Sequence, residues 1–173
     1  DFPKAFLLWN VLGAASQQLG KNEQALFAFN KVIENNPEHP DGYNNLGTVL
    51  KQEGRLQEAI KAYEKTIAIK PDHAEAFNNM GNVLQELDEH NRAIASYQKA
   101  ISINKNYPEA LNNLGMSLKE TGEHIQSLEA FTRAIELKPS YAEAYFNKGK
   151  FFHEHADLVK AIEFYEKAIE IKP

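Results

Sequence analysis

The chain has 173 residues and no cysteine, and its hydrophobic and charged fractions, 43% and 25%, are those of an ordinary globular protein. This composition excludes a disordered chain, a collagen and a disulfide-stabilised miniprotein. A net charge of −5 argues against nucleic-acid binding, which depends on Lys and Arg. No apolar run reaches the roughly 20 residues of a membrane span. We therefore expect neither nucleic-acid nor membrane partners, and the lack of cysteine favours a cytoplasmic location.

Proline and glycine recur along the chain at one fixed interval, which is the step from Pro3 to Pro37. One proline series is Pro3, Pro37, Pro71, Pro139 and Pro173, with Lys105 in the vacant place. One glycine series is Gly13, Gly47, Gly81, Gly115 and Gly149, and a second is Gly20, Gly54 and Gly122. Such a period along the whole chain predicts a repeat protein. We number the repeats 6–39, 40–73, 74–107, 108–141 and 142–173, and we expect residues 1–5 to be the remnant of a preceding repeat in a longer array.

Each repeat is predicted to form two antiparallel helices. Positions are counted from the first residue of each repeat. In the first helix, large or apolar residues at positions 4, 7 and 11 make one stripe. The glycine at position 8 lies inside this helix, where glycine costs about 1 kcal/mol relative to alanine, so we expect a close helix contact there. The glycine at position 15 ends the first helix. The second helix has a small residue at position 20, an aromatic at position 24 and a terminal proline at position 32.

These columns resemble the tetratricopeptide repeat (TPR), and the resemblance covers residues 6–173. It implies an all-α fold, an α-solenoid in which about five helix-turn-helix units form a single array and a right-handed superhelix. The first helices would line the concave surface. The sequence departs from the pattern at Lys148 in the apolar column of position 7, at Lys105 in the proline column, and at Ser16 and Ser127 in two packing columns.

Asparagine fills positions 5 and 6 of most first helices, although it is less favourable than alanine inside a helix by about 0.7 kcal/mol. Its side-chain amide offers a donor and an acceptor, which match those of a peptide group. We predict a ladder that holds an extended peptide by its backbone; the alternative is that the asparagine at position 6 serves hydrogen bonding between repeats. The resemblance places positions 2, 5, 6, 9, 12 and 13 in the concave groove, and similar columns line the TPR arm of O-linked N-acetylglucosamine transferases. The predicted peptide-binding residues are Asn10, Asn44, Asn45, Asn78, Asn79, Asn82, Asn112, Asn113 and Asn147.

Position 2 is acidic in four repeats. An acidic groove for basic ligands is one interpretation, but we favour helix capping. Three residues before each acid stands a polar residue, which is typical of a capping box, and acids in a first turn suit the helix dipole. The Lys and Arg clamp that holds a C-terminal carboxylate in some TPR domains is absent. The acids are Asp41, Glu75, Glu109 and Glu143, and the predicted caps are Glu38, Asp72, Asn106 and Ser140.

The six histidines do not predict a metal site. Equivalent histidines, such as His39 and His73, stand a whole repeat apart, and His153 and His155 are too close in sequence to face each other on a helix. No phosphate-binding loop, nucleophile elbow or zinc-protease motif occurs. We therefore expect no catalytic residue, no metal, no cofactor and no enzyme activity.

Three functions remain open. We favour a protein-interaction module that binds an extended peptide or partner segment in an Asn-lined concave groove. The second possibility is the substrate-recruiting arm of a larger glycosyl- or sulfotransferase. The third is a scaffold that self-associates through its uncapped ends. Those ends would expose Ile162, Tyr165 and Ile169 on the last helix and Phe6 and Trp9 on the first.

Overall fold

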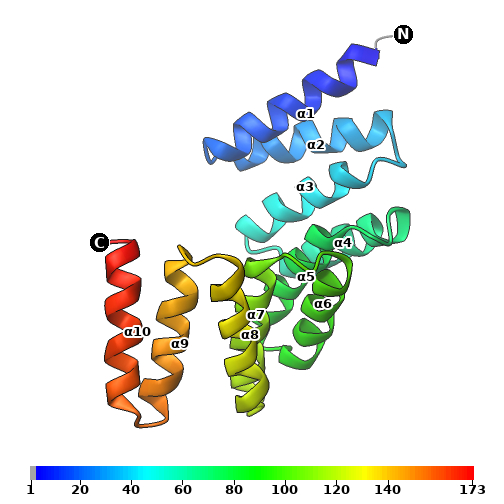
Figure 1. Ribbon diagram of the computed structural model, residues 1–173. Helices are drawn as coiled ribbons and strands as arrows, with labels where there is room; N and C mark the ends of the chain where they lie inside the picture. The colour runs from blue at the N-terminus through cyan, green and yellow to red at the C-terminus, as the bar shows by residue number, and fades with distance from the viewer. Residues whose placement is uncertain (1–2) are drawn as a thin grey trace. The chain divides into compact units, whose positions relative to one another are not determined.

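The computed structural model describes residues 3–173. Over this range the chain is all-α, and ten helices follow one another in helix-turn-helix pairs (Figure 1). None of these helices is both long enough and apolar enough to cross a bilayer. The predicted fold class is confirmed. The helices are α1 (Pro3–Gln18), α2 (Asn22–Asn35), α3 (Pro40–Gln52), α4 (Leu56–Ile69), α5 (Ala74–Glu86), α6 (His90–Ile103), α7 (Pro108–Glu120), α8 (His124–Leu137), α9 (Ala142–Glu154) and α10 (Leu158–Ile171).

The helices gather into two compact halves, which we describe separately. The N-terminal half runs up to Leu87 and holds α1–α5, and the C-terminal half, Asp88–Pro173, holds α6–α10. Within each half, every helix packs against the next one along the chain. First helices also touch first helices: α1 contacts α3, α3 contacts α5, and α7 contacts α9. Of the expected remnant 1–5, residues 1 and 2 lie outside the described range, and α1 begins at Pro3, ahead of the first numbered repeat.

The glycine at position 8 lets the two helices of a repeat pack closely. A Cβ atom added to Gly47 would lie 2.7 Å from the ring of Tyr63, and one added to Gly115 would lie 2.7 Å from the ring of Phe131. Both rings are fully buried. The predicted close contact is confirmed, because the aromatic ring of position 24 fills the space that a side chain would need. The same contact occurs at Gly13 with Phe29 and at Gly149 with Tyr165.

The turn inside each repeat needs a left-handed residue at position 15. Gly20, Gly54 and Gly122 adopt φ values of 68°, 73° and 83° there. The two residues that replace glycine in this column, Asp88 and Ala156, adopt the same conformation, with φ of 58° and 60°. A residue with a Cβ is strained in this region by roughly 1–2 kcal/mol. The turn geometry of the repeat is therefore kept at Ala156 at the expense of stability.

Consecutive repeats meet where a second helix packs on the next first helix. In the second to fifth repeats, position 3 of the first helix is Gly or Ala, and the structure shows two of these residues packed on positions 27 and 28 of the preceding second helix. At Gly42, an added Cβ would lie 3.0 Å from Val32 and 3.3 Å from Ile33. In the C-terminal half, Ala144 shares one buried cluster with Ala134, and Ile135 packs against that cluster. The small residues at position 3 thus set how closely two repeats approach each other.

Lys148 occupies position 7, where the other repeats carry Leu or Met. The side chain is half-buried, and its Nζ donates a hydrogen bond to Thr132 Oγ1 over 2.8 Å. The ammonium also lies 4.6 Å from the ring centroid of Phe164. Burial lowers the pKa of Lys148, because the charged form loses hydration. The departure seen in the sequence is therefore accommodated by one hydrogen bond and one cation–π contact.

Candidate functional site

The asparagines at position 5 lie between the first helices of consecutive repeats. In the N-terminal half, Asn44 on α3 is only 3% exposed. Its Nδ2 donates to Glu75 Oε1 over 3.2 Å, and its Oδ1 accepts from Asn79 Nδ2 over 3.2 Å. Both partners belong to α5. A single buried amide therefore joins two first helices through its donor and its acceptor.

The C-terminal half repeats this arrangement residue for residue. Asn112 on α7 is fully buried. Its Nδ2 donates to Glu143 Oε1 over 3.4 Å, and its Oδ1 accepts from Asn147 Nδ2 over 3.0 Å. Asn147 also approaches Met116 Sδ at 3.4 Å. Because equivalent positions make the same two bonds in both halves, the bridge belongs to the repeat and not to one local environment.

The two asparagine columns are thus placed differently. The inter-repeat hydrogen bonding that the sequence left open as the alternative for position 6 is present at Asn79 and Asn147, which donate to the position-5 asparagines of the preceding repeats. At position 5, Asn44, Asn78 and Asn112 are buried. The column at position 6 is more accessible. Asn45, Asn79 and Asn113 are half-buried, as are Asn10 and Asn82, whereas Asn147 is 9% exposed. In each half we call the surface of the first helices that carries the position-6 asparagines the Asn face: it holds Asn45 and Asn79 in the N-terminal half, and Asn113 and Asn147 in the C-terminal half.

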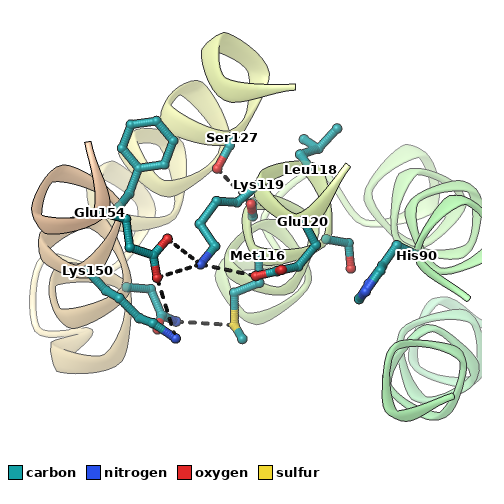
Figure 2. A network of polar contacts seen from close by, with 12 residues as sticks. His90, Met116, Leu118, Lys119, Glu120, Ser127, Lys150 and Glu154 are labelled. Atoms are coloured by element: carbon teal, nitrogen blue, oxygen red, sulfur yellow. Dashed lines mark hydrogen bonds and ion pairs between the residues drawn. The ribbon is translucent and has the colours of Figure 1, made fainter. Parts of the chain in front are cut away.

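Ion pairs between first helices accompany the asparagines. In the C-terminal half, Lys119 lies between two acids, with Nζ 2.7 Å from Glu154 Oε2 and 3.1 Å from Glu120 Oε1 (Figure 2). Lys150 approaches the same Glu154 at 3.9 Å. In the N-terminal half, Lys51 pairs with Glu86 on the next first helix at 2.9 Å. These pairs were not predicted, although Lys at position 12 and Glu at position 13 of the next repeat are a recognisable sequence signal.

The pairing stabilises the charged forms of these side chains, and each charge lies beside one of opposite sign. Burial opposes the charge on Lys119, yet hydrogen bonds to Glu154 and Glu120 outweigh burial and raise the pKa of the ammonium. The hydrogen bond from Lys119 in turn lowers the pKa of the Glu154 carboxyl. Each lysine has a carboxylate beside it, so the paired charges largely cancel at a distance. The surface beside these pairs is therefore polar without a strong field of one sign.

The capping boxes expected from the sequence are wrong. The N-caps of α3 and α5 are His39 and His73, one residue later than the predicted Glu38 and Asp72. His39 Nδ1 accepts from the Gly42 N–H over 3.1 Å, and His73 Nδ1 accepts from the Ala76 N–H over 3.2 Å. In α7 and α9 the N-cap position is a tyrosine whose side chain makes no capping bond. The one-residue shift removes the spacing that a capping box needs.

The acids of position 2 bind other elements instead. Asp41 Oδ1 lies 3.0 Å from His73 Nε2, so this histidine joins the start of α5 to α3. Glu109 pairs at 2.9 Å with Lys138, the residue that follows α8. Glu75 and Glu143 accept from the buried asparagines described above. The acidic column therefore links neighbouring elements, and its first-turn location also suits the helix dipole.

Four of the histidines serve capping or packing: His39 and His73 cap helices, and His124 and His155 pack among aromatic rings. His155 stacks on Phe151 with ring centroids 4.2 Å apart, and the ring of His124 lies edge-on to it at 4.5 Å. His155 Nδ1 is 2.8 Å from the Phe151 carbonyl oxygen. Across residues 3–173, no three His, Asp or Glu side chains are grouped as metal ligands.

Models of known protein families identify the type of repeat. A tetratricopeptide-repeat model matches residues 40–106, 72–140 and 106–173, and a second tetratricopeptide-repeat model matches residues 7–39. The chain belongs to the tetratricopeptide repeat family. Together the matches run from Leu7 to the end of the chain. No curated protein matches the chain.

Solved structures similar to this TPR chain share its fold over nearly its whole length. A crystal structure of MamA is 27% identical, with a TM-score of 0.80, and the match covers 93% of this chain and 94% of MamA. YrrB, described as a TPR protein with an unusual peptide-binding site, is 27% identical, with a TM-score of 0.73 and coverage of 93% and 83%. PilF of Pseudomonas aeruginosa is 22% identical, with a TM-score of 0.89 and coverage of 98% and 78%. The all-α solenoid of helix-turn-helix repeats is thus shared with all three.

Proposed function

We propose that this TPR protein is a protein-interaction module whose Asn face holds an extended peptide by its backbone. The observation that carries the proposal is the repeated pairing of a buried position-5 asparagine with a position-6 asparagine. Asn44 orients Asn79 in one half, and Asn112 orients Asn147 in the other. The position-5 residues are positioning residues, and the position-6 residues are the proposed contacts.

In the N-terminal half, the pairing leaves peptide-binding capacity on the side-chain amide of Asn79. A side-chain amide carries two N–H donors and a carbonyl acceptor. The bond to Asn44 uses one N–H of Asn79. The second N–H and the carbonyl oxygen match the acceptor and donor of a peptide group. Because Asn44 fixes the amide in place, less conformational entropy is lost when a ligand binds.

The charge distribution favours backbone recognition over recognition of a charged side chain. The lysines beside the Asn face are paired with acids at 2.9 Å and 2.7 Å, so neither charge is unbalanced. A ligand would therefore be held mainly by neutral hydrogen bonds, with weak dependence on its sequence and on salt. YrrB, a TPR protein of 27% identity, is described as having a peptide-binding site, which supports the same class of ligand.

A peptide array probed with the chain would supply a ligand, and the strongest hit would then be titrated in solution. The triple variant Asn45→Ala, Asn79→Ala, Asn113→Ala should weaken binding by at least about tenfold, since three polar contacts are lost. Circular dichroism should show nearly unchanged helicity at the temperature of the titration, with a lowered melting temperature because Asn79→Ala removes the partner of buried Asn44. The same peptide with N-methyl groups on its backbone should also bind at least about tenfold more weakly, because it lacks the amide donors.

The matched control is Asn30→Ala, Asn35→Ala, Asn91→Ala, which removes three exposed asparagines from second helices. This variant should bind the peptide like the unmodified chain. The proposal fails if both triple variants bind equally well, or if the N-methylated peptide keeps its affinity. Unfolding of the first triple variant would instead assign position 6 a structural role.

A further inference from the structure

Lys148 is a lysine in a column of the repeat that is otherwise apolar. Its side chain is half-buried between α8 and α10. Nζ donates to Thr132 Oγ1 of α8 over 2.8 Å and lies 4.6 Å from the ring centroid of Phe164 of α10. Both neighbours belong to the fourth and fifth repeats, so the setting of this amine lies within the C-terminal half. The residues at the same position of the other repeats are Leu12, Leu46, Met80 and Leu114.

The groups that contact this amine are uncharged. Among the described residues, no carboxylate lies within ion-pair distance of Lys148. Lys119, by contrast, has Glu154 at 2.7 Å. A carboxylate holds a lysine in its charged form, whereas burial beside neutral groups favours the neutral amine. Glu136 and Glu163 attract the charge on Lys148 from farther away, but burial outweighs them and lowers the pKa of the amine.

Thr132 orients the amine without using its lone pair. The Thr132 hydroxyl donates its single hydrogen to the Leu128 carbonyl oxygen over 2.7 Å. Towards Lys148 this hydroxyl can therefore only accept, and Nζ supplies the N–H of the bond in its neutral form as in its charged form. The lone pair of the neutral amine stays free. A lysine that is desolvated beside apolar groups in this way is an activated nucleophile.

An open, mainly apolar pocket of about 420 Å³ lies against α8 beside the amine. Thr132 is part of its lining, so Nζ of Lys148, 2.8 Å from the Thr132 hydroxyl, stands at the edge of the pocket. The pocket offers a short apolar chain a place next to a nucleophilic nitrogen. It is lined by Ile125, Leu128, Glu129, Thr132 and Arg133.

We propose that Lys148 is a site of covalent acylation by short-chain acyl phosphates. The setting supplies a nucleophile and a pocket, so the donor must bring an activated leaving group, which phosphate is. The lone pair of Nζ attacks the carbonyl carbon, a C–N bond forms, and the C–O bond to phosphate breaks. Phosphate leaves with the electron pair, and the proton lost by the nitrogen passes to water. The amide product has no charge, and its N–H can still donate to Thr132.

Acetyl phosphate is the probe, and mass spectrometry follows the acetylation of each lysine in the folded chain. Near neutral pH, Lys148 should react at least about threefold faster than Lys65, an exposed lysine of α4, because more of its amine is neutral. The rate at Lys148 should also level off at a lower pH than the rate at Lys65. In concentrated urea the two lysines should react alike, because the difference comes from the fold.

Thr132→Glu is the decisive variant. Thr132 stands at position 25, where two other repeats carry Glu64 and Glu166, so glutamate is compatible with the fold. The new carboxylate would pair with the ammonium of Lys148 and hold it in the charged form. Acetylation of Lys148 should therefore slow to the rate of Lys65 or below.

Gln98→Glu is the matched control. Gln98 stands at the same position of the third repeat and lines a crevice with Leu114, the leucine that takes the place of Lys148 at that junction. This variant should leave the rate at Lys148 unchanged. Two results would each overturn the proposal: a Lys148 that reacts no faster than Lys65 in the folded chain, or a Thr132→Glu chain that keeps the fast rate. Melting curves show that each variant is folded.

Discussion

The side-chain amide of Asn147 donates to Oδ1 of Asn112 over 3.0 Å, which joins the first helices of two consecutive repeats. Asn112 is fully buried, so its amide has no water to bind if the partner is lost. The same bond links Asn79 to Asn44. These buried asparagines have their hydrogen-bond partners only when two repeats pack in the native register. Any other register would leave a buried amide unpaired and would therefore raise the free energy of the folded chain.

The first prediction separates the two asparagine columns. Asn44→Ala should lower the free energy of unfolding by about 1–3 kcal/mol, because Asn79 and Glu75 each lose a partner. Asn45→Ala, one residue later and half-buried, should change it by less than about 0.5 kcal/mol. Urea denaturation followed by circular dichroism measures both. Equal losses in the two variants would mean that position 5 has no special structural role.

The second prediction concerns the glycine of position 8. Alanine is the better helix former by about 1 kcal/mol, but a Cβ on Gly115 would lie 2.7 Å from Phe131. Gly115→Ala should therefore destabilise the chain by about 1–3 kcal/mol through overpacking. In a Phe131→Leu background the penalty should shrink, because the ring that blocks the Cβ is gone. A double-mutant cycle in urea measures this coupling, and a coupling of zero would contradict the steric explanation.

The third prediction concerns the left-handed alanine. Ala156 has φ of 60°, in a turn where three other repeats use glycine. Ala156→Gly should raise the free energy of unfolding by about 1 kcal/mol, because the strain of the Cβ is removed. Ala95→Gly, on the exposed side of α6, is the control and should lose about 1 kcal/mol. Differential scanning calorimetry should show melting temperatures that move in opposite directions.

The fourth prediction concerns Lys148, the lysine in an apolar column. Lys148→Leu places the usual residue of the column at this position and removes a charge whose hydration is reduced by burial. Exchanging buried charges for hydrophobic residues is often neutral or stabilising by roughly 1–4 kcal/mol, so we expect a gain of about 1 kcal/mol at pH 7. A loss of stability would show that the bond to Thr132 and the contact with Phe164 outweigh the cost of burial.

The gain should also depend on pH. The lowered pKa means that the folded chain binds the Lys148 proton less tightly than the unfolded chain does. Stability of the unmodified chain therefore rises as the pH climbs through that lowered pKa toward the ordinary value of 10.5. The advantage of Lys148→Leu should be full at pH 7 and should shrink toward pH 10. Urea curves at several pH values test this slope.

The helix pairs could be predicted because the repeat places each packing residue in a column of its own. Gly47 and Tyr63 illustrate this: neither is informative alone, but five equivalent pairs imply a close contact. The strain at Ala156 and the accommodation of Lys148 could not be predicted in the same way. They are single departures, and their outcome depends on which neighbours can move to meet them.

The candidate site was less predictable because Asn44 and Asn45 are adjacent in one helix. Their side chains point about 100° apart, so one faces the next helix and the other does not. The sequence pattern alone does not show which of the two side chains faces the next helix. The caps at His39 and His73 were missed for a related reason. Asp72 is a better capping residue by type, but the chain enters α5 one residue later, so the imidazole of His73 meets the helix N–H groups first.

The ion pairs beside the Asn face carry one more consequence. The pair of Lys51 with Glu86 and the pair of Lys119 with Glu154 stand two repeats apart, at every second junction. At the other junctions position 12 is glutamine, so no such pair forms. The charge pairing thus alternates along the array. Deleting the second repeat alone would leave Glu86 facing Gln17, whereas deleting the second and third repeats together would remove one pair whole and keep that of Lys119 with Glu154.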